Sequence, residues 1–287
     1  MRRCFLLLSL FAFLNGQAQL LLAEKEWFGL TNYFDAKEIQ ANKIEAIHIK
    51  VEDKKDGEII RHKGNFLHYE FNKAGQLRQS LKSIPLARKI DTSSYHFAYD
   101  AAGRLYKKSE EYGPFHFTYF HFYQDDQLHK EVKIDQSRKQ NDSLHIRFFK
   151  LEEGEQKRVV HTLNQKKEPF KTTTQEFNQL GLLKKEKTSF RRGRSYELKE
   201  YSYHNQKLSL LREERFFVSK KERLKKFFYT ENSYREISLF EEGEIVKKRG
   251  FTYREDGLIK AVIERNYREK SIRIYHFMYR FLPLQKQ

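Results

Sequence analysis

Four histidines stand between aromatic residues, and their type and spacing come closest to a metal site. They are His96 in "YHFAY", His116 and His121 in "FHFTYFHFY", and His276 in "YHFMY". Because successive side chains of a strand point to opposite faces, we expect these histidines opposite the aromatic face, in solvent. A bulge near Tyr119–Phe120 would keep the rings of that stretch on one face and bring His116 and His121 together. Two histidines without a third ligand make a weak site, so we predict no bound metal.

The carboxylates do not indicate a catalytic site. The pairs Glu110–Glu111, Glu152–Glu153 and Glu241–Glu242 stand beside lysines near expected turns, where solvated charge is the ordinary state. The chain contains no G-x-S-x-G, H-E-x-x-H, Walker or dinucleotide-binding motif. We predict no catalytic, cofactor-binding or metal-binding residues, and a non-catalytic protein that binds or scaffolds. An envelope hydrolase built from scattered residues stays as the alternative.

The charge balance is basic, with 56 Lys and Arg against 39 Asp and Glu and a net charge of +17. Dense basic stretches occur at Phe190–Arg194, Ser219–Lys226 and Val246–Arg249. Basic hairpin edges would attract an anionic envelope polymer. We favour the other interpretation, in which lysines keep the chain soluble and block strand addition at sheet edges. Another envelope protein is the second partner class, and nucleic acid is excluded because the chain carries an export signal.

The elements that must position these residues are strands. Aromatic residues make up 15% of the chain and prolines number only 4, although the mean hydropathy is −0.83. Aromatic side chains that alternate with charged ones are typical of strands with one buried face. Adjacent charges such as Lys107–Lys108 and Lys184–Lys185 would point one charge at lipid, so we predict no transmembrane span in the mature chain.

A repeated segment organises most of the chain. Each copy runs from an aromatic residue through four or five polar or small residues to an aliphatic one, and the copies begin about 26 residues apart, as in repeat architectures. Clear copies begin at Phe71, Tyr99, Phe122, Phe177 and Tyr253, and weaker ones at Phe149, Tyr203, Phe228 and Tyr279. We take Phe71, Tyr99, Phe122, Phe177, Tyr203, Phe228 and Tyr253 as the structural aromatic positions. The predicted fold is all-β: repeated antiparallel hairpins in a long meander sheet of about sixteen to eighteen strands, which must curl or coil.

The turns of these hairpins have a shared chemistry. Gly75, Gly103, Gly181 and Gly257 stand four residues after the aromatic residue. A short hairpin loop built on a type I turn needs a positive φ at its end, which glycine adopts without a steric clash. The Asn or Asp that follows the aromatic residue in several copies is suited to accept hydrogen bonds from turn amides. We therefore predict the four glycines as structural turn positions.

One copy resembles a known repeat. In "FAYDAAGRL", Phe97, Tyr99, Asp100, Gly103 and the Arg104–Leu105 pair match the YD repeat of Rhs-type and teneurin-type proteins, and the chain also resembles secreted Bacteroidetes-type proteins with a few such repeats. The other copies are degenerate. The resemblance implies a coil or shell of β-hairpins and no catalytic residues. MORN-like hairpin repeats are the second resemblance, which the absence of a regular second glycine disfavours.

The N-terminus indicates export. Arg2 and Arg3 precede an apolar run, and Ala18 ends a small-x-small cleavage pattern. The apolar run is shorter than the roughly 20 residues that span a bilayer, and Cys4 precedes it, which disfavours a membrane anchor and a lipoprotein. We predict a signal peptide (1–18), an N-terminal cap segment (19–42) and a β-hairpin repeat domain (43–287), in a periplasmic or secreted protein without disulfides.

Overall fold

The chain forms one antiparallel sheet of eighteen strands and one short helix. The computed structural model describes residues 20–22, 33–85, 90–137, 143–191, 195–231 and 233–283. The predicted signal peptide lies outside these residues. The elements are α1 (Ala36–Ala41), β1 (Ile44–Lys55), β2 (Arg61–Phe71), β3 (Leu77–Pro85), β4 (Ile90–Tyr99), β5 (Leu105–Tyr112), β6 (Phe115–Gln124), β7 (Gln127–Asp135), β8 (Ser143–Gly154), β9 (Lys157–Leu163), β10 (Pro169–Phe177), β11 (Leu183–Phe190), β12 (Tyr196–His204), β13 (Lys207–Phe216), β14 (Lys220–Thr230), β15 (Ser233–Glu241), β16 (Glu244–Tyr253), β17 (Ile259–Asn266) and β18 (Ser271–Phe281).

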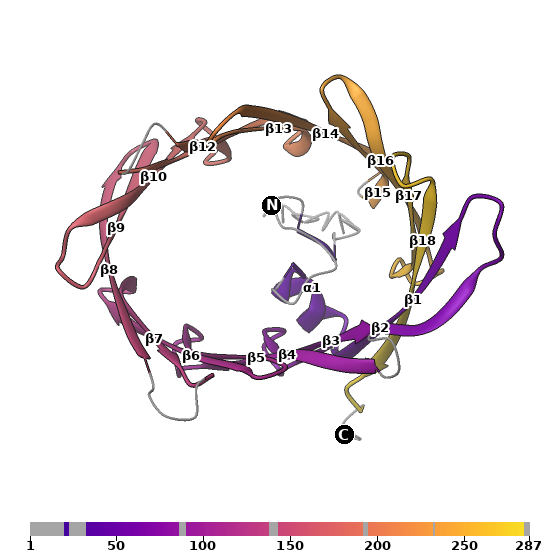
Figure 1. Cartoon of the computed structure of the whole chain (residues 1–287), viewed down its shortest axis with the longest axis horizontal. Coiled ribbons are helices and arrows are strands. Elements are labelled where there is room, and N and C mark those ends of the chain that lie inside the picture. The colour runs from indigo at the N-terminus through magenta and orange to yellow at the C-terminus, as the bar shows by residue number, and fades with distance from the viewer. Residues whose placement is uncertain are drawn as a thin grey trace, which may run out of the picture.

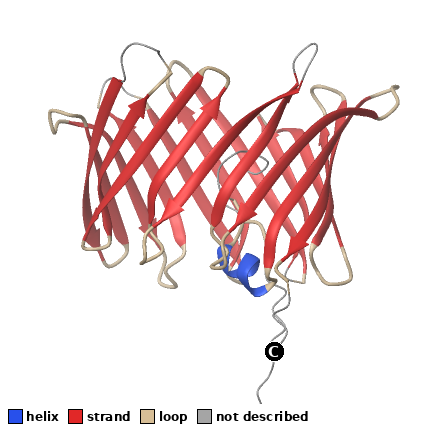
Figure 2. Ribbon diagram, turned by 90° about the horizontal axis from the view of Figure 1, so that it is seen from below, coloured by secondary structure: helices blue, strands red, loops and turns tan. Residues whose placement is uncertain are grey.

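The sheet closes into a barrel. Each strand pairs with the next one along the chain, and β18 returns to pair with β1, so that Ile47 lies opposite Tyr279 and Ile49 opposite Phe277. Figure 1 shows the resulting ring from one end, and Figure 2 shows its tilted strands from the side. The predicted all-β meander of antiparallel hairpins is therefore confirmed. The predicted open sheet that curls or coils is wrong, because the first strand pairs with the last and the sheet closes on itself.

The two faces of the wall follow from strand alternation. Tyr69 and Phe71 of β2 pack their rings on Tyr33 and Phe34, with centroids 5.1 to 5.4 Å apart. Tyr33 and Phe34 directly precede α1, which lies within the ring in Figure 1. We call the described residues 20–22 and 33–41 the N-terminal segment. The face that carries Tyr69 is thus the inner one. Because residues that face each other across a ladder share a side, the strand pairings extend this assignment around the barrel.

The glycine turns gather at one end of the barrel, where α1 lies. The φ angles of Gly75, Gly103, Gly181 and Gly257 are 75°, 77°, 73° and 80°. In the first of these turns the side-chain oxygen of Asn72 accepts hydrogen bonds from the backbone amides of Ala74 and Gln76, each 3.0 Å long. Gly75 also lies directly under the helix, where a Cβ atom would come within 1.9 Å of the carbonyl oxygen of Ala36.

A ladder of tyrosine hydroxyls joins successive hairpins at this end. Each hydroxyl belongs to a tyrosine within the last three residues of an even-numbered strand and donates to a backbone carbonyl near the start of the preceding strand, over 2.6 to 2.9 Å. The donors are Tyr99, Tyr123, Tyr203, Tyr229, Tyr253 and Tyr279, and the acceptors are Leu77, Leu105, Leu183, Leu208, Tyr234 and Ile259. The repeat therefore uses tyrosine for its hydroxyl group as well as for its ring.

The main core lies between the N-terminal segment and part of the wall. Leu21, Phe34 and Ile39 of that segment are buried against the inner faces of β1 and β2, where Ile47 and Tyr69 have no exposed surface. The Asp35 side chain accepts from the Lys37 amide at the start of α1. No helix in the described part of the chain is long and apolar enough to cross a membrane.

Candidate binding surface on the inner wall

The inner wall carries a belt of charge beyond the aromatic residues. Glu264 lies two residues from buried Val262, and Glu213 lies two residues from buried Leu211, so both carboxylates face inward. Carboxylates of the described inner wall have basic partners at 2.6 to 3.7 Å. The pairs are Asp53–Arg273, Glu110–Lys108, Glu131–Arg147, Glu186–Lys199, Glu197–Arg215, Glu213–Lys225, Glu241–Arg223 and Glu264–Arg249.

Glu264 shows the electrostatics of this belt. Its side chain is only 6% exposed, and the Arg249 guanidinium lies 2.6 Å from it. Burial opposes ionisation of the carboxyl, but the charges of Arg249 and Lys247 outweigh burial and lower the pKa of Glu264. The carboxylate is therefore held in its charged form between two cations inside the barrel.

Water reaches this belt. The inward-pointing side chains of Arg147, Arg215 and Arg223 are 52%, 43% and 46% exposed. Barrels of 16 to 18 strands enclose a lumen too wide for side chains to fill. The lumen of this barrel is therefore wet at the height of the charged belt, and its wall can meet a dissolved ligand.

The N-terminal segment covers only one part of the wall. Buried hydrophobic residues of the wall come from β1 to β3 and from β12 onward. In the described residues between Leu77 and Tyr201, no hydrophobic side chain is buried. In the described residues, the inner face of β4 to β11 thus contains no buried hydrophobic residue, and only Phe97 and Leu183 at its two borders pack against the core. We call this part the bare wall, and a ligand in the lumen would contact it.

A step in strand pairing opens a notch in the bare wall. Phe148 is the only residue of β8 that lies opposite residues of both neighbours, Lys130 of β7 and Leu163 of β9. The part of β8 before Phe148 pairs only with β7, and the part after it pairs only with β9. The first half of β8 and the β9–β10 turn therefore enclose a notch of about 590 Å³, lined by Lys133, Leu144, His145, Ile146, Arg147, Asn164, Gln165, Lys166 and Phe170.

An exposed row of aromatic rings adjoins this notch. Tyr112, Phe115 and Phe117 lie on the inner face of β5 and β6, with neighbouring centroids 6.4 Å apart and planes within 14° of each other. Tyr112 is 52% exposed and Phe115 is 47% exposed. The Lys133 ammonium lies 3.7 Å from the centroid of the Phe117 ring and also lines the notch. Lys133 thus connects the aromatic row with the basic notch.

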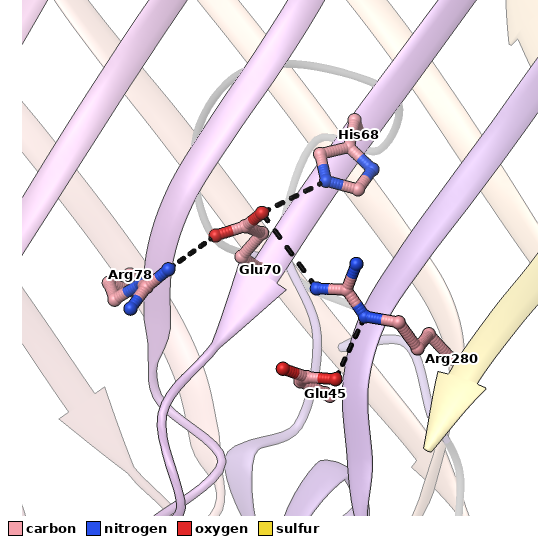
Figure 3. A network of polar contacts seen from close by, with 5 residues as sticks. All are labelled: Glu45, His68, Glu70, Arg78 and Arg280. Atoms are coloured by element: carbon pink, nitrogen blue, oxygen red, sulfur yellow. Dashed lines mark hydrogen bonds and ion pairs between the residues drawn. The ribbon is translucent and has the colours of Figure 1, made fainter. Parts of the chain in front are cut away.

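The outer wall is charged as well. On β15 and β16, Glu236 lies 2.6 Å from Lys248, and on β11 and β12, Lys185 lies 3.8 Å from Glu200. Figure 3 shows a larger network on the outer face of β1, β2, β3 and β18, in which Glu70 contacts His68, Arg78 and Arg280, and Arg280 also contacts Glu45. The hydrogen bond from Arg78 outweighs burial and lowers the pKa of Glu70. Ion pairs therefore lie on the outer face of at least three parts of the described wall: β11 and β12, β15 and β16, and β18 to β3.

The predicted aromatic positions divide between the two faces. Five of them face inward at the turn end, namely Phe71, Tyr99, Phe177, Tyr203 and Tyr253. Phe122 and Phe228 face outward instead and are 47% and 38% exposed. Their neighbours Tyr123 and Tyr229 take the inward position and make the carbonyl hydrogen bonds. The "aromatic-x-tyrosine" spacing of Phe227 and Tyr229 would have identified the second of these tyrosines, because the ladder position follows another inward side chain by two residues.

The structure separates the histidines that the sequence placed together. The β6–β7 bulge lies at Phe122/Tyr123 and not at Tyr119–Phe120, so His116 and His121 point to opposite faces. His121 faces inward, 3.4 Å from Glu131, whereas His116 is exposed on the outer face. In the described part of the chain no cluster of three His, Cys, Asp or Glu residues could hold a metal ion.

Two features of the bare wall were not predicted from the sequence. The β9–β10 turn repeats the Asn turn without its glycine: Asn164 accepts from the amides of Lys166 and Glu168, and Lys167 takes the positive φ of 59°. This turn was not predicted because the hairpin turns were identified in the sequence by their glycine, and this turn has none. The change of pairing partner at Phe148 of β8 could not be predicted from the sequence, because the residues of one strand do not specify its register with the next strand.

Comparisons with known proteins give a distant likeness. No family model and no curated protein matches the chain. Among solved structures, the chain is similar to a porin-like protein from Bacteroides uniformis ATCC 8492, at 10% identity over 83% of this chain and 97% of that chain, with a TM-score of 0.45. It is also similar to a porin-like protein from Bacteroides vulgatus ATCC 8482, at 8% identity over 83% and 99% of the two chains, with a TM-score of 0.37. These likenesses are too distant to transfer a function.

The resemblance to the YD repeat of Rhs-type proteins is wrong. That resemblance implied a coil or shell of hairpins, whereas β1 and β18 pair and close this sheet into a single barrel. What Phe97, Tyr99 and Gly103 share with the repeat is a local hairpin geometry. A positive-φ glycine after an aromatic strand end serves any antiparallel hairpin and does not define how the sheet closes.

Proposed function

We propose that this chain is a non-catalytic envelope protein whose barrel stands in water and binds a dissolved ligand on its bare inner wall. The observation that carries the proposal is the exposed inner face of β4 to β11, where aromatic rings and ion pairs meet a wet lumen. A binding surface needs accessible side chains of both kinds, since rings supply contact area and charges supply orientation.

The outer wall supports a barrel in water rather than in lipid. Lys185 and Lys248 lie on the outer face within their strands, and a basic side chain near the middle of a bilayer costs about 2–4 kcal/mol. Partner carboxylates would also have to leave water. Such a wall is stable where water solvates the ion pairs.

The N-terminal segment supports export with cleavage after Ala18. Leu20 and Leu21 are 6% and 1% exposed and belong to the core inside the barrel. The folded domain therefore includes residues that follow the predicted cleavage position almost at once. Cleavage there would leave the core complete and release the barrel into the periplasm or the medium.

A pair of adjacent threonines provides the test. Thr173 faces inward and lies opposite Thr188, whereas Thr174 of the same strand faces outward. Since Cys4 is the only cysteine and lies in the predicted signal peptide, Thr173→Cys and Thr174→Cys each give the mature chain a single thiol. We expect both thiols to react with a small maleimide in detergent-free buffer, and only Cys at 174 to react with a maleimide attached to a large polymer.

The same variants distinguish a membrane channel. Lipid vesicles added to the Thr174→Cys variant should leave its labelling rate unchanged. Protection of this thiol by vesicles, with continued labelling of Thr173→Cys, would place the outer wall in lipid and overturn the proposal. Aggregation of both variants without detergent would contradict it as well.

A further inference from the structure

The notch beside β8 is suited to a negatively charged group. Its lining contains three basic side chains, Lys133, Arg147 and Lys166. Among the described residues that line it, none is acidic. Its volume of about 590 Å³ is within the usual range for small-ligand sites. The planar guanidinium of Arg147 is matched to a carboxylate, and its side chain is half exposed although it also contacts Glu131 at 3.5 Å.

The aromatic row beside the notch is suited to flat apolar faces. The rings of Tyr112, Phe115 and Phe117 follow one another along the wall with nearly parallel planes. Exposed rings in such a row bind partners that carry both an apolar face and polar edges, and a pyranose ring has this shape. Two side-chain amides at the notch, those of Asn164 and Gln165, supply donors and acceptors for hydroxyl groups.

The surrounding acids limit how the ligand's charge is distributed. Glu110 and Glu131 lie on the inner face of β5 and β7, next to the row, and Asp135 lies opposite Phe117. A polymer with a phosphate at every unit would bring negative charge against these carboxylates. A ligand with spaced charges can place one carboxylate in the notch and neutral sugar faces on the rings, and so avoids this repulsion.

We propose that the aromatic row and the notch form one site for an acidic oligosaccharide, with a uronate carboxylate at Arg147 and Lys166 and a sugar ring on Phe115. This site rests on the proposed function, since it uses the bare inner wall as the binding surface. Lys133 positions the two halves, because its ammonium lies on the Phe117 ring at the border of the notch. Nucleic acid also combines charge with stacking rings, and the local carboxylates disfavour it.

Calorimetric titration of the mature protein with trigalacturonate, and with neutral galactotriose as the control, tests the site. We expect trigalacturonate to bind at least about tenfold more tightly than the neutral sugar. Phe115→Ala should weaken its binding by about tenfold, because the sugar loses its stacking surface. Phe122→Ala is the matched control: Phe122 is equally exposed, at 47%, but lies on the outer wall, so binding should not change.

Lys166→Ala probes the notch, with exposed Lys184→Ala as its control. We expect only the former to weaken trigalacturonate binding and to reduce its dependence on salt. Equal binding of a single-stranded oligothymidylate, lost in Phe115→Ala, would overturn the carbohydrate assignment. Failure of trigalacturonate to bind, while Thr173→Cys remains reactive in buffer, would overturn this inference and leave the water-filled binding barrel in place. Protection of Thr174→Cys by vesicles would overturn the proposed function itself.

Discussion

The covered and bare parts of the wall are built from the same kind of strand and differ in what lies against them. On the covered part, Ile49 of β1 and Tyr69 of β2 have no exposed surface, because the N-terminal segment packs on them. On the bare part, Phe115 of β6 also faces inward and remains 47% exposed. Strand alternation therefore decides which way a side chain points, and only the covering segment decides whether it becomes core. The barrel uses one part of its wall for stability and leaves the other for binding.

The largest expected difference between the two parts comes from removing a ring. Tyr69→Ala should lower the free energy of unfolding by about 3–5 kcal/mol, because it empties a site packed by Tyr33 and Phe34. Phe115→Ala should cost far less, about 0.5 kcal/mol, since Phe115 is 47% exposed and no segment of the described chain covers it. Urea denaturation followed by circular dichroism measures both. Equal losses in the two variants would show that the bare wall is covered in solution.

The next largest effect concerns the turn glycines. Gly75→Ala should cost about 3 kcal/mol or more, because positive φ is strained with a Cβ atom and the atom would also collide with the Ala36 carbonyl. Gly257→Ala has the strain without the collision, since a Cβ atom at this position would meet no other atom within 4 Å, and should cost about 1–2 kcal/mol. Urea midpoints of the two variants measure this difference. Equal urea midpoints for Gly75→Ala and Gly257→Ala would contradict the prediction and show that α1 does not pack on the β2–β3 turn.

A hydroxyl of the tyrosine ladder should contribute more to stability on the covered part of the wall than on the bare part. Tyr279→Phe leaves the Ile259 carbonyl without its donor in a buried place, and should cost about 1–3 kcal/mol. Burial also raises the pKa of the Tyr279 hydroxyl. Tyr123→Phe removes the equivalent bond to Leu105 beside the wet lumen, where water can replace it, and should cost less than about 0.5 kcal/mol. Thermal unfolding of both variants gives the comparison, and an equal shift would contradict the difference in burial.

The smallest expected effect is a pH dependence. The lowered pKa of Glu264 means that its carboxylate stabilises the fold above the unfolded-state pKa of about 4.3. This contribution is lost as the pH falls through the lower pKa of the folded state. The stability of the wild type should therefore fall more steeply below about pH 4.3 than that of Glu264→Gln. Glu176→Gln, an exposed outer-wall change, serves as the control and should keep the wild-type slope.

The hairpins were predictable because they are local. An aromatic strand end, an Asn or Asp and a positive-φ glycine lie within five residues of one another, and the structure forms the turns at Asn72, Asp100 and Asn178 in this way. Where the local signal was ambiguous, the prediction chose the wrong neighbour: Phe122 and Phe228 precede the tyrosines that face inward. The candidate site was not predictable, because Phe115, Arg147 and Lys166 come from separate hairpins and meet only through the register of β6 to β10.

The residues by themselves determined that the chain is a series of antiparallel hairpins with one aromatic side, because alternation and turn chemistry act over a few neighbouring residues. Only the tertiary structure determined that β18 pairs with β1. This pairing closes the sheet, turns its aromatic side inward and encloses a lumen. The tertiary structure also decided that Leu21 and Phe34 would enter that lumen and cover only part of it. These choices depend on contacts between residues more than two hundred positions apart, as between Asp53 and Arg273, and no local pattern encodes such a pairing.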